Sequence, residues 1–348
     1  MNYPIPPLAN DLLLRAVNRQ PVPRVPAWLM RQAGRSDPQY RAYRERVGLG
    51  LYELFRSPEH AIPISLLPQR IGVDAIIMFQ DILTPLTPMG ADFAFNPGPV
   101  LAEPLRRAGQ VKELRAYGVA DELGFVGETI SGLLRELGGA LPLLGFAGAP
   151  FTLAAFMIEG RSPSEDMASV LAFAEEQPEA FAGLIDALTA LTTDYLNYQI
   201  EAGVHAVQLF ESIGERIPRP LYERYAQPSH ERIFSALRSD VPSMLFVKGS
   251  PYPELMLVCG AAVLSIDERT PLSAVQAHGK VVQGNVDNRV LASGSREDVA
   301  EAVRACVAAG GGVGHILNLS HGILPRTPFE NVQQFVSTAR EIPFPVPK

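Results

Sequence analysis

The sequence has few residues of the kinds that anchor metals, disulfides or Schiff bases. It contains two cysteines and four lysines, namely Cys259, Cys306, Lys112, Lys248, Lys280 and Lys348. Both cysteines lie in apolar segments, and two alone form neither a disulfide framework nor a metal-ligand pattern, so we expect inert buried thiols. Because the cysteines form no metal-ligand pattern, we also expect no bound metal. The scarcity of lysine limits chemistry that needs an amine nucleophile.

The sequence also lacks a convincing membrane-spanning segment. The uncharged stretch Leu137–Ile158 is long enough to cross a bilayer, but six glycines and prolines interrupt it. We interpret it as a buried strand, a tight turn and the start of a buried helix. The N-terminus shows no basic region followed by an apolar core, so we expect no signal peptide and a reducing, cytoplasmic location.

The charge of the chain is unevenly distributed. The net charge of −7 argues against nucleic acid as a partner. Residues 1–60 nevertheless carry nine arginines against five acidic residues, so this region is basic within an acidic protein. Such a distribution fits a small anionic substrate better than a polyanion.

Short apolar runs alternate with helical patterns along the chain. The predicted strands are Val25–Met30, Val73–Phe79, Pro142–Ala147, Val204–Phe210, Ser243–Val247, Ala262–Ile266, Val281–Gln283 and His315–Leu319. The predicted helices are Asp11–Arg19, a helix from Pro58 towards Arg70 with Ser57 as N-cap, Asp121–Leu137, Pro178–Glu201, Leu221–Leu237, Tyr252–Val258, Pro271–Ala277, Arg296–Ala309 and Phe329–Arg340. The proline- and glycine-containing segment Thr87–Gly98 predicts an excursion or hairpin.

Eight near-continuously apolar strands followed by helices are typical of a parallel sheet covered on its faces. At this length they predict an α/β fold, a single (β/α)8 TIM-type barrel domain over residues 1–348 with a short N-terminal extension. A doubly wound sheet is the alternative. It is weakened because no glycine-rich phosphate-binding motif follows a strand.

In a (β/α)8 barrel the active site lies at the C-terminal ends of the strands. The residues found there are Arg31 and Arg35, Asp81, Gly148–Pro150, Glu211 and Ser212, Lys248, Asp267, Asn285 and Asp287, and Ser320 and His321. Arg31 and Arg35 stand out because only small residues and Gln32 separate them. Two guanidinium groups after one strand predict a grip on carboxylates or phosphates, although surface arginines are the plainer alternative.

Six sequence blocks carry a resemblance to a known family. They are WLMRQAGR (Trp28–Arg35), FQDIL (Phe79–Leu83), GFAGAPFTLAAFMIEG (Gly145–Gly160), LFES (Leu209–Ser212), QGNVD (Gln283–Asp287) and NLSHGILP (Asn318–Pro325). Together they resemble the uroporphyrinogen decarboxylase family over nearly the whole chain. The resemblance implies a distorted (β/α)8 barrel that forms a homodimer. It also implies removal of CO₂ from the four acetate side chains of uroporphyrinogen III to give coproporphyrinogen III in heme biosynthesis, with no metal or organic cofactor.

The resemblance also implies roles for individual residues. Asp81 corresponds to the catalytic carboxylate, and Arg31 and Arg35 to residues that hold substrate carboxylates. The substrate-binding residues implied by the same blocks are Arg31, Gln32, Ala33, Gly34, Arg35, Asp81, Phe156, Ser212 and His321. The chain departs from the family at Phe156, where the family has tyrosine, and at Glu268, Ser320 and Asn288, where it has tryptophan, glycine and proline.

The implied reaction needs an electron sink, because loss of CO₂ leaves a carbanion. Protonation of the pyrrole at carbon supplies that sink without a cofactor. Asp81 would accept hydrogen bonds from pyrrole N–H groups and stabilise the developing positive charge. The proton donor stays open between an arginine and an ordered water. His321 has an ordinary pKa suited to proton transfer, but the resemblance marks it as a binding residue.

Three alternatives come from other classes. A cobalamin-linked methyltransferase of the same superfamily would need a zinc-thiolate site of the His-x-Cys…Cys kind, and the sequence contains no such pattern. A binding-only paralogue would hold a tetrapyrrole without turnover, and the departures from the family motivate it. A Schiff-base aldolase would need Lys248 or Lys280 as its amine.

Overall fold

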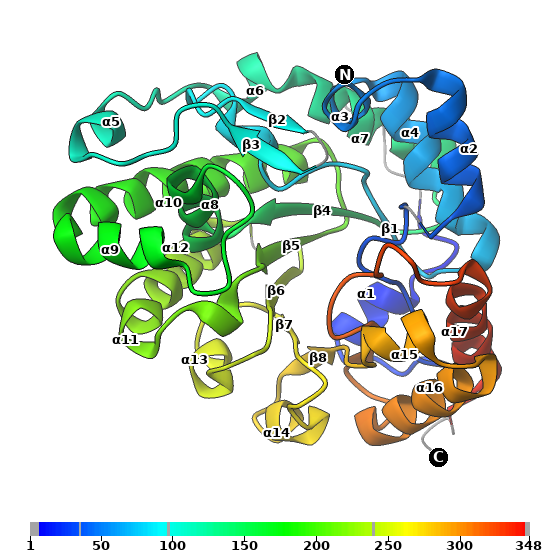
Figure 1. Ribbon diagram of the computed structural model, residues 1–348. Coiled ribbons are helices and arrows are strands. Elements are labelled where there is room, and N and C mark those ends of the chain that lie inside the picture. Colours follow the sequence, from blue (N-terminus) through cyan, green and yellow to red (C-terminus); the bar gives the residue numbers. More distant parts are fainter. Residues whose placement is uncertain (1–6, 35, 96–97, 239–240, 345–348) are drawn as a thin grey trace.

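The computed structural model describes residues 7–34, 36–95, 98–238 and 241–344. Seven parallel strands form one curled sheet in the order β1-β4-β5-β6-β7-β8-β9, with helices on its outer side (Figure 1). The strands are β1 (Ile76–Ile77), β4 (Leu143–Gly148), β5 (Ala206–Glu211), β6 (Ser243–Val247), β7 (Val263–Ser265), β8 (Val281–Gln283) and β9 (His315–Ile316). The α/β barrel-type fold predicted from the alternating pattern is confirmed.

The predicted first strand, Val25–Met30, is wrong as a strand. This segment makes one isolated parallel bridge, Ala27 with Leu317. Leu317 N donates to Pro26 O at 2.9 Å on one side, and Asp74 N donates to Ala27 O at 2.8 Å on the other. The segment therefore lies along the seam between the two ends of the curled sheet, next to β9 and β1.

Side chains explain why this segment is not a strand. Ala27 N donates to Asp74 Oδ2 at 2.8 Å, Leu29 N to Gln32 Oε1 at 3.1 Å and Met30 N to Asn318 Oδ1 at 3.2 Å. A regular ladder would use these three N–H groups for backbone carbonyls of the neighbouring strands. The apolar run is buried as predicted, but its backbone is held by polar side chains.

The helices follow the predicted order, with several additions. They are α1 (Leu12–Val17), α2 (Pro38–Val47), α3 (Leu51–Arg56), α4 (Pro58–Leu66), α5 (Ala108–Lys112), α6 (Val119–Glu122), α7 (Gly124–Leu137), α8 (Pro150–Glu159), α9 (Ala168–Glu176), α10 (Pro178–Glu201), α11 (Arg219–Leu221), α12 (Gln227–Ala236), α13 (Pro253–Leu257), α14 (Leu272–Gln276), α15 (Asn288–Ser293), α16 (Arg296–Gly310) and α17 (Phe329–Glu341). Shorter turns are the 3₁₀ segments η1 (Leu67–Ile71), η2 (Thr84–Leu86) and η3 (Gly214–Arg216), and the π-helical η4 (Tyr222–Ala226).

Helix α4 differs from its prediction in two details. It begins at Pro58 after Ser57, as expected, but the Ser57 side chain makes no capping hydrogen bond. It ends at Leu66 and continues as the 3₁₀ turn η1, not as an α-helix towards Arg70. Pro68 explains the change, because it lacks the N–H that an α-helix interior requires.

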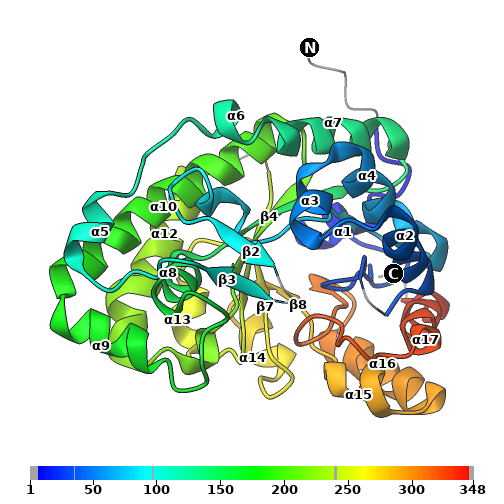
Figure 2. The ribbon, with the colours of Figure 1, turned by 45° about the horizontal axis from the view of Figure 1, so that its top comes forward.

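The predicted excursion after β1 is a β-hairpin. Strands β2 (Phe93–Phe95) and β3 (Pro99–Leu101) pair antiparallel, with Phe93 opposite Leu101. Leu101 N donates to Gly160 O at 2.7 Å, so the hairpin is attached to the end of α8. Both views place it beside α8 and α3 (Figures 1 and 2).

A chain of polar side chains crosses the buried interior of the barrel. Trp28 Nε1 donates to Gln283 Oε1 at 2.9 Å, and Gln283 Nε2 donates to Gln208 Oε1 at 2.8 Å and to Ser265 Oγ at 3.1 Å. All four residues are fully buried. Because an unpaired buried amide is costly, this network fixes the register of side chains inside the barrel.

Among the described residues, no helix combines the length and apolar character needed to cross a membrane. The stretch Leu137–Ile158 instead forms the end of α7, strand β4 and most of α8, which matches its prediction as strand, turn and helix start.

Candidate active site

A cavity of about 460 Å³ opens at the C-terminal ends of the strands. Its lining comes from the loop after Met30, the loop after β1, the ends of β4 and β5, helices α2, α3 and α8, the hairpin, and the loop after β9. The volume lies in the range of small-molecule sites, about 300–1,000 Å³. The cavity is therefore where the barrel prediction places an active site.

The cavity walls are largely aromatic. Six phenylalanines line it, namely Phe55, Phe79, Phe95, Phe146, Phe156 and Phe210. Phe55 and Phe79 have ring centroids 4.8 Å apart, and Phe146 and Phe210 meet edge to face at 5.7 Å. Such walls provide apolar surface for a large ring system, while the few polar groups determine its orientation.

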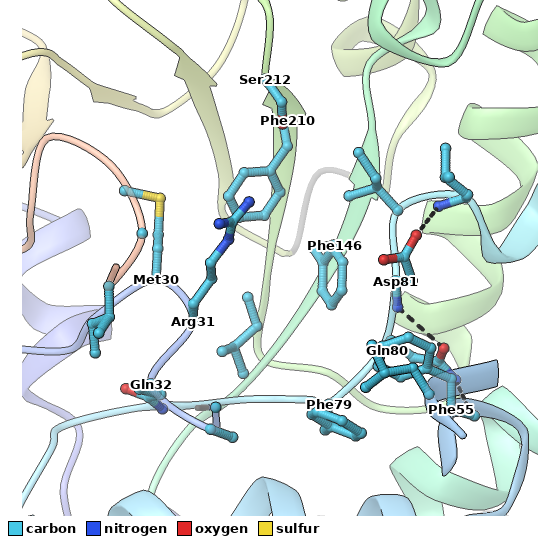
Figure 3. Close-up of a pocket in the computed structure, with 18 of the residues that line it drawn as sticks. Met30, Arg31, Gln32, Phe55, Phe79, Gln80, Asp81, Phe146, Phe210 and Ser212 are labelled. Atoms are coloured by element: carbon cyan, nitrogen blue, oxygen red, sulfur yellow. Dashed lines mark hydrogen bonds between the residues drawn. The ribbon is translucent and has the colours of Figure 1, made fainter. Parts of the chain in front are cut away.

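Arg31 enters this cavity from the loop that follows Met30. Its backbone has φ 63°, a left-handed conformation that is unusual for a residue with a side chain. Figure 3 shows its guanidinium group pointing into the cavity from the side opposite Asp81. Arg35, the second member of the predicted pair, lies outside the described residues.

The residues between the two arginines also line the cavity: Gln32, Ala33 and Gly34. The Gln32 side chain is buried and already occupied, since it accepts from Leu29 N and donates to Ala75 O at 2.9 Å. It therefore fixes the loop that carries Arg31. Its predicted contact with substrate is not tested by these bonds.

Asp81 follows β1 by four residues and lies on the opposite wall (Figure 3). Its Oδ1 accepts a hydrogen bond of 2.9 Å from Leu83 N. Gln80 braces the turn, because its Nε2 donates to Phe55 O at 2.6 Å and its Oε1 accepts from Thr84 Oγ1 at 2.9 Å.

Burial raises the pKa of Asp81, and the Leu83 N–H and the charge of Arg31 only partly oppose this effect. Among the described residues that line the cavity, Asp81 is the only acidic one. A carboxylate in this setting is stabilised by any ligand that brings N–H donors or positive charge.

His321 reaches the cavity from the loop after β9. Its Nδ1 accepts a hydrogen bond of 2.6 Å from Gly322 N, so in the neutral ring Nε2 carries the proton. Burial, together with the positive charges of Arg31 and Lys248, lowers the pKa of His321 to about 3, although Asp267 opposes this shift. At neutral pH this residue is an uncharged hydrogen-bond donor and not an acid.

Ser212, one residue past β5, also lines the cavity. Its backbone N donates to Thr152 Oγ1 at 2.9 Å. The cavity thus brings together Arg31, Gln32, Ala33, Gly34, Asp81, Phe156, Ser212 and His321, which are all the predicted site residues that the structure describes.

Other polar residues expected at the strand ends do not line the cavity. Lys248 Nζ pairs with Glu215 at 2.6 Å, and Asp267 accepts from Arg269 Nε at 2.6 Å. Asn285 donates to the carbonyls of Asp267 and Thr270, and Asp287 caps α15 by accepting from Arg289 N. Their strand-end position was correctly predicted, but local ion pairs and caps occupy them. Glu211 and Ser320 are buried and do not line the cavity either.

The two lysines proposed for a Schiff base are poorly placed for one. Lys248 is held in its ion pair with Glu215. Lys280 precedes β8, at the opposite end of the strand from the cavity, and donates to Ala261 O at 3.2 Å. These contacts weigh against the aldolase alternative.

Both cysteines are free and buried, as predicted. Cys306 Sγ lies 4.0 Å from His315 Nε2, and Cys259 lies elsewhere, between α13 and β7. Within the part of the chain that the structure describes, no three His, Cys, Asp or Glu side chains come together as metal ligands. The thiolate zinc site of the methyltransferase alternative is not assembled there.

The sequence reasoning missed the contribution of α2 and α3. Tyr40, Leu51 and Phe55 line the cavity from these helices. The signal for α2 was present: Asp37 caps the helix by accepting from Gln39 N, Pro38 follows at the first position, and Gly48 ends it in the left-handed conformation.

Comparison with known proteins agrees with this picture. The family model described as "Uroporphyrinogen decarboxylase (URO-D)" matches residues 8–342. The uroporphyrinogen decarboxylase of Syntrophotalea carbinolica is 41% identical over 336 residues, covering 94% of this chain and 97% of the relative. A uroporphyrinogen decarboxylase of Thermus thermophilus is 42% identical over 343 residues, covering 96% of this chain and 99% of the relative.

Solved structures show the shared fold at low identity. A methyltransferase from Methanosarcina mazei superposes with a TM-score of 0.81 at 18% identity, covering 97% of this chain and 99% of that one. A B12-independent methionine synthase from Shewanella sp. W3-18-1 gives a TM-score of 0.57 at 12% identity, covering 83% and 87%. From the family match and the relatives at about 40% identity, the chain belongs to the uroporphyrinogen decarboxylase family.

Proposed function

We propose that this protein is a uroporphyrinogen decarboxylase, which removes CO₂ from the four acetate side chains of uroporphyrinogen III to give coproporphyrinogen III. One observation carries the proposal beyond family membership. In a cavity with several phenylalanines at the strand ends, the half-buried carboxylate of Asp81, the only acidic group among the described residues that line the cavity, lies opposite the guanidinium group of Arg31. This arrangement suits a substrate with a ring of N–H donors at its centre and carboxylates around its edge.

Asp81 acts in the proposed reaction as a fixed negative charge. It accepts hydrogen bonds from pyrrole N–H groups and stabilises the cation that forms when the pyrrole is protonated at carbon. That cation then accepts the electron pair as the C–C bond to CO₂ breaks. Because the Asp81 carboxyl is partly withdrawn from water, which raises its pKa, its attraction to the cation is stronger than it would be in water.

The other polar groups hold the substrate carboxylates. Arg31 offers a charged, forked donor, and His321 offers the Nε2–H of a neutral ring. Ser212 contributes a hydroxyl at the end of β5. We include Arg35 in this set from the sequence block that it shares with Arg31.

The mechanism makes no demand on a metal or organic cofactor, because the protonated pyrrole is itself the electron sink. An arginine or an ordered water donates the proton to the pyrrole carbon. After CO₂ has left, the exocyclic methylene carbon takes up a proton and the ring carbon gives one up, which leaves a methyl group.

A second candidate is a paralogue that binds the tetrapyrrole without turnover. Phe156 favours it, because this cavity residue lacks the hydroxyl of the family's tyrosine. The two candidates share a ligand and differ only in the release of CO₂.

The test is anaerobic incubation of the purified protein with uroporphyrinogen III, followed by oxidation and chromatography of the porphyrins. A ladder of products from eight to four carboxylates supports the decarboxylase. Binding of the porphyrinogen without such a ladder supports the binding-only paralogue. If the protein neither binds the porphyrinogen nor forms these products, both proposals are contradicted.

Three further parts of the proposal rest on the family resemblance and the sequence. We propose that the chain forms a homodimer, that it works in the cytoplasm, and that residues 1–348 make up one domain. Light scattering after size-exclusion chromatography tests the dimer, and limited proteolysis tests the single domain.

A further inference from the structure

Behind the cavity, three buried polar side chains form a hydrogen-bonded chain that ends on the backbone of Ser212. Glu211 is the last residue of β5. One of its carboxylate oxygens, Oε1, accepts a hydrogen bond from Thr152 Oγ1 of α8, and the other, Oε2, lies 3.2 Å from His230 Nε2 of α12. Thr152 Oγ1 in turn accepts a hydrogen bond of 2.9 Å from Ser212 N. Glu211, Thr152 and His230 are each 0% exposed.

The backbone N–H of Ser212 determines the direction of this chain. A backbone N–H can only donate, so Thr152 Oγ1 accepts its hydrogen bond. The one hydroxyl hydrogen of Thr152 is then donated to Glu211 Oε1. The threonine hydroxyl is thus held in one orientation between these two partners.

Thr152 also joins two walls of the cavity. It lies one helical turn before Phe156 on α8, and Phe156 lines the cavity. Through Ser212 N it is bound to the end of β5, where Phe210 and Ser212 line the cavity as well. The Thr152 hydroxyl therefore ties α8 to the residue that follows β5, in addition to the backbone hydrogen bond of 2.9 Å from Ala149 N to Phe210 O.

Packing alone does not explain why this hydrogen-bonded group contains a glutamate and a histidine. Burying a glutamate beside a histidine is costly, and apolar residues of similar size are often as stable or more so. Neither Glu211 nor His230 lines the cavity. Glu211 is connected to the cavity through its hydrogen bond with Thr152, while His230 also packs against the ring of Tyr222 with centroids 5.9 Å apart.

We propose that Thr152, oriented by Glu211 and His230, is a positioning residue that holds Ser212 where its hydroxyl meets a carboxylate of the substrate. The nature of that substrate rests on the proposed function. The positioning itself rests on the hydrogen bonds of Thr152 and Glu211.

The experiment is a double-mutant cycle with Thr152→Val and Ser212→Ala. Valine has nearly the shape of threonine but cannot accept the Ser212 N–H. Thr152→Ser keeps the hydroxyl and serves as the rescue variant. Thr189→Val is the matched control, because Thr189 is a buried helical threonine whose hydroxyl donates to Ile185 O within α10. Each variant is assayed for kcat and KM with uroporphyrinogen III, and for binding of the oxidised octacarboxylic porphyrin by fluorescence.

We expect Thr152→Val to lower kcat/KM by about tenfold or more, because small misplacements of a binding group cost up to about 100-fold. Thr152→Ser should stay within about threefold of the parent, and Thr189→Val should be unchanged. In the Ser212→Ala background, Thr152→Val should cause no further loss, because it acts through Ser212. Additive losses, or parental kinetics in Thr152→Val, would overturn the proposal.

The kinetics and the porphyrin binding together separate this proposal from the proposed function. If the parent protein binds porphyrin without releasing CO₂, the proposed function fails. The double-mutant cycle measured by porphyrin binding then still decides the positioning role. If the parent turns over but the losses add, the positioning role fails alone. Should Thr152→Val not fold, Glu211→Gln takes its place in the same cycle under the same criterion.

Discussion

Gly322 packs directly against the side chain of Arg31. A Cβ atom at position 322 would lie 2.6 Å from Arg31 Cδ and 2.8 Å from Arg31 Cγ, closer than real Cβ contacts allow. The glycine thus leaves the space through which the Arg31 side chain enters the cavity. The space is needed because Arg31 starts from a left-handed backbone conformation.

Gly322→Ala should therefore displace Arg31 and lower kcat/KM for uroporphyrinogen by about tenfold to 100-fold. The effect should lie mainly in KM if Arg31 holds a carboxylate equally in the ground and transition states. Steady-state kinetics with Gly183→Ala as control checks this, since nothing lies within 4 Å of a Cβ at Gly183. Equal kinetics of the two variants would contradict the role given to Gly322.

Asp81→Asn should lower kcat by about 10²–10³-fold, the typical loss when one preorganised electrostatic contact is removed. The asparagine keeps the size of the side chain, so porphyrin binding should change far less than turnover. The exposed Asp92→Asn is the control. A folded Asp81→Asn protein with parental turnover would remove Asp81 from the mechanism.

The raised pKa of Asp81 also predicts how stability changes with pH. The folded protein keeps the Asp81 proton to a higher pH than the unfolded chain does. This contribution to stability is fully present below the unfolded pKa and is lost as the pH rises through the folded pKa. Asp81→Asn should therefore have a higher Tm than the parent near neutral pH, and the difference should shrink in acid. Calorimetry from about pH 4 to about pH 8 measures it; a constant difference would contradict the prediction.

His321 should not shape the pH dependence of activity. Because burial and the charges of Arg31 and Lys248 lower its pKa to about 3, it stays neutral over the working range. His321→Asn should reduce kcat/KM by about tenfold through loss of a hydrogen bond to a charged group. The form of the pH–rate profile between about pH 5 and about pH 8 should be unchanged. A shifted limb in the variant would identify His321 as a titrating catalytic group.

Phe156→Tyr tests the main departure from the family. The added hydroxyl would point into the cavity and could donate to a substrate carboxylate. A hydrogen bond to a charged group is typically worth about 1.5–3 kcal/mol, so kcat/KM should rise by about tenfold or more. Progress curves of parent and variant, each recorded separately with substrate well below KM, give the ratio of their kcat/KM values. A fall in the ratio would mean that this cavity is shaped around phenylalanine.

Gln283→Leu should destabilise the fold by about 1–3 kcal/mol, because it leaves Trp28 Nε1 without its acceptor and Gln208 without its donor. Urea unfolding gives the free energy, with the exposed Gln333→Leu as control. An unchanged midpoint would show that the polar chain inside the barrel does not contribute to stability.

The sequence predicted most of this architecture, because each apolar run had to be buried in a strand. The prediction of a strand at Val25–Met30 was wrong for a physical reason. The N–H groups of Ala27 and Met30 are satisfied by Asp74 and Asn318, which are distant in the sequence. An apolar run cannot reveal which distant side chain will replace a strand as acceptor.

The candidate site was predicted to a similar extent. Asp81 and His321 come at strand ends and do line the cavity. Lys248 and Asp267 come at strand ends equally clearly, yet pair with Glu215 and Arg269. The position after a strand indicates the right edge of the barrel, but the choice between ligand and neighbour depends on partners in loops that carry no periodic pattern.

The placement of Asp81 has a consequence for the order of events in turnover. It is the only acidic residue among the described residues that line the cavity, and it is held on one wall by Leu83 N and by the turn braced by Gln80. In the proposed reaction, this stationary carboxylate stabilises the cation of one pyrrole in any given orientation of the macrocycle. The macrocycle must therefore be re-oriented in the cavity, or leave and return, before each successive acetate is lost. If it leaves, partly decarboxylated tetrapyrroles compete with fresh substrate, and their accumulation should depend on the ratio of substrate to enzyme.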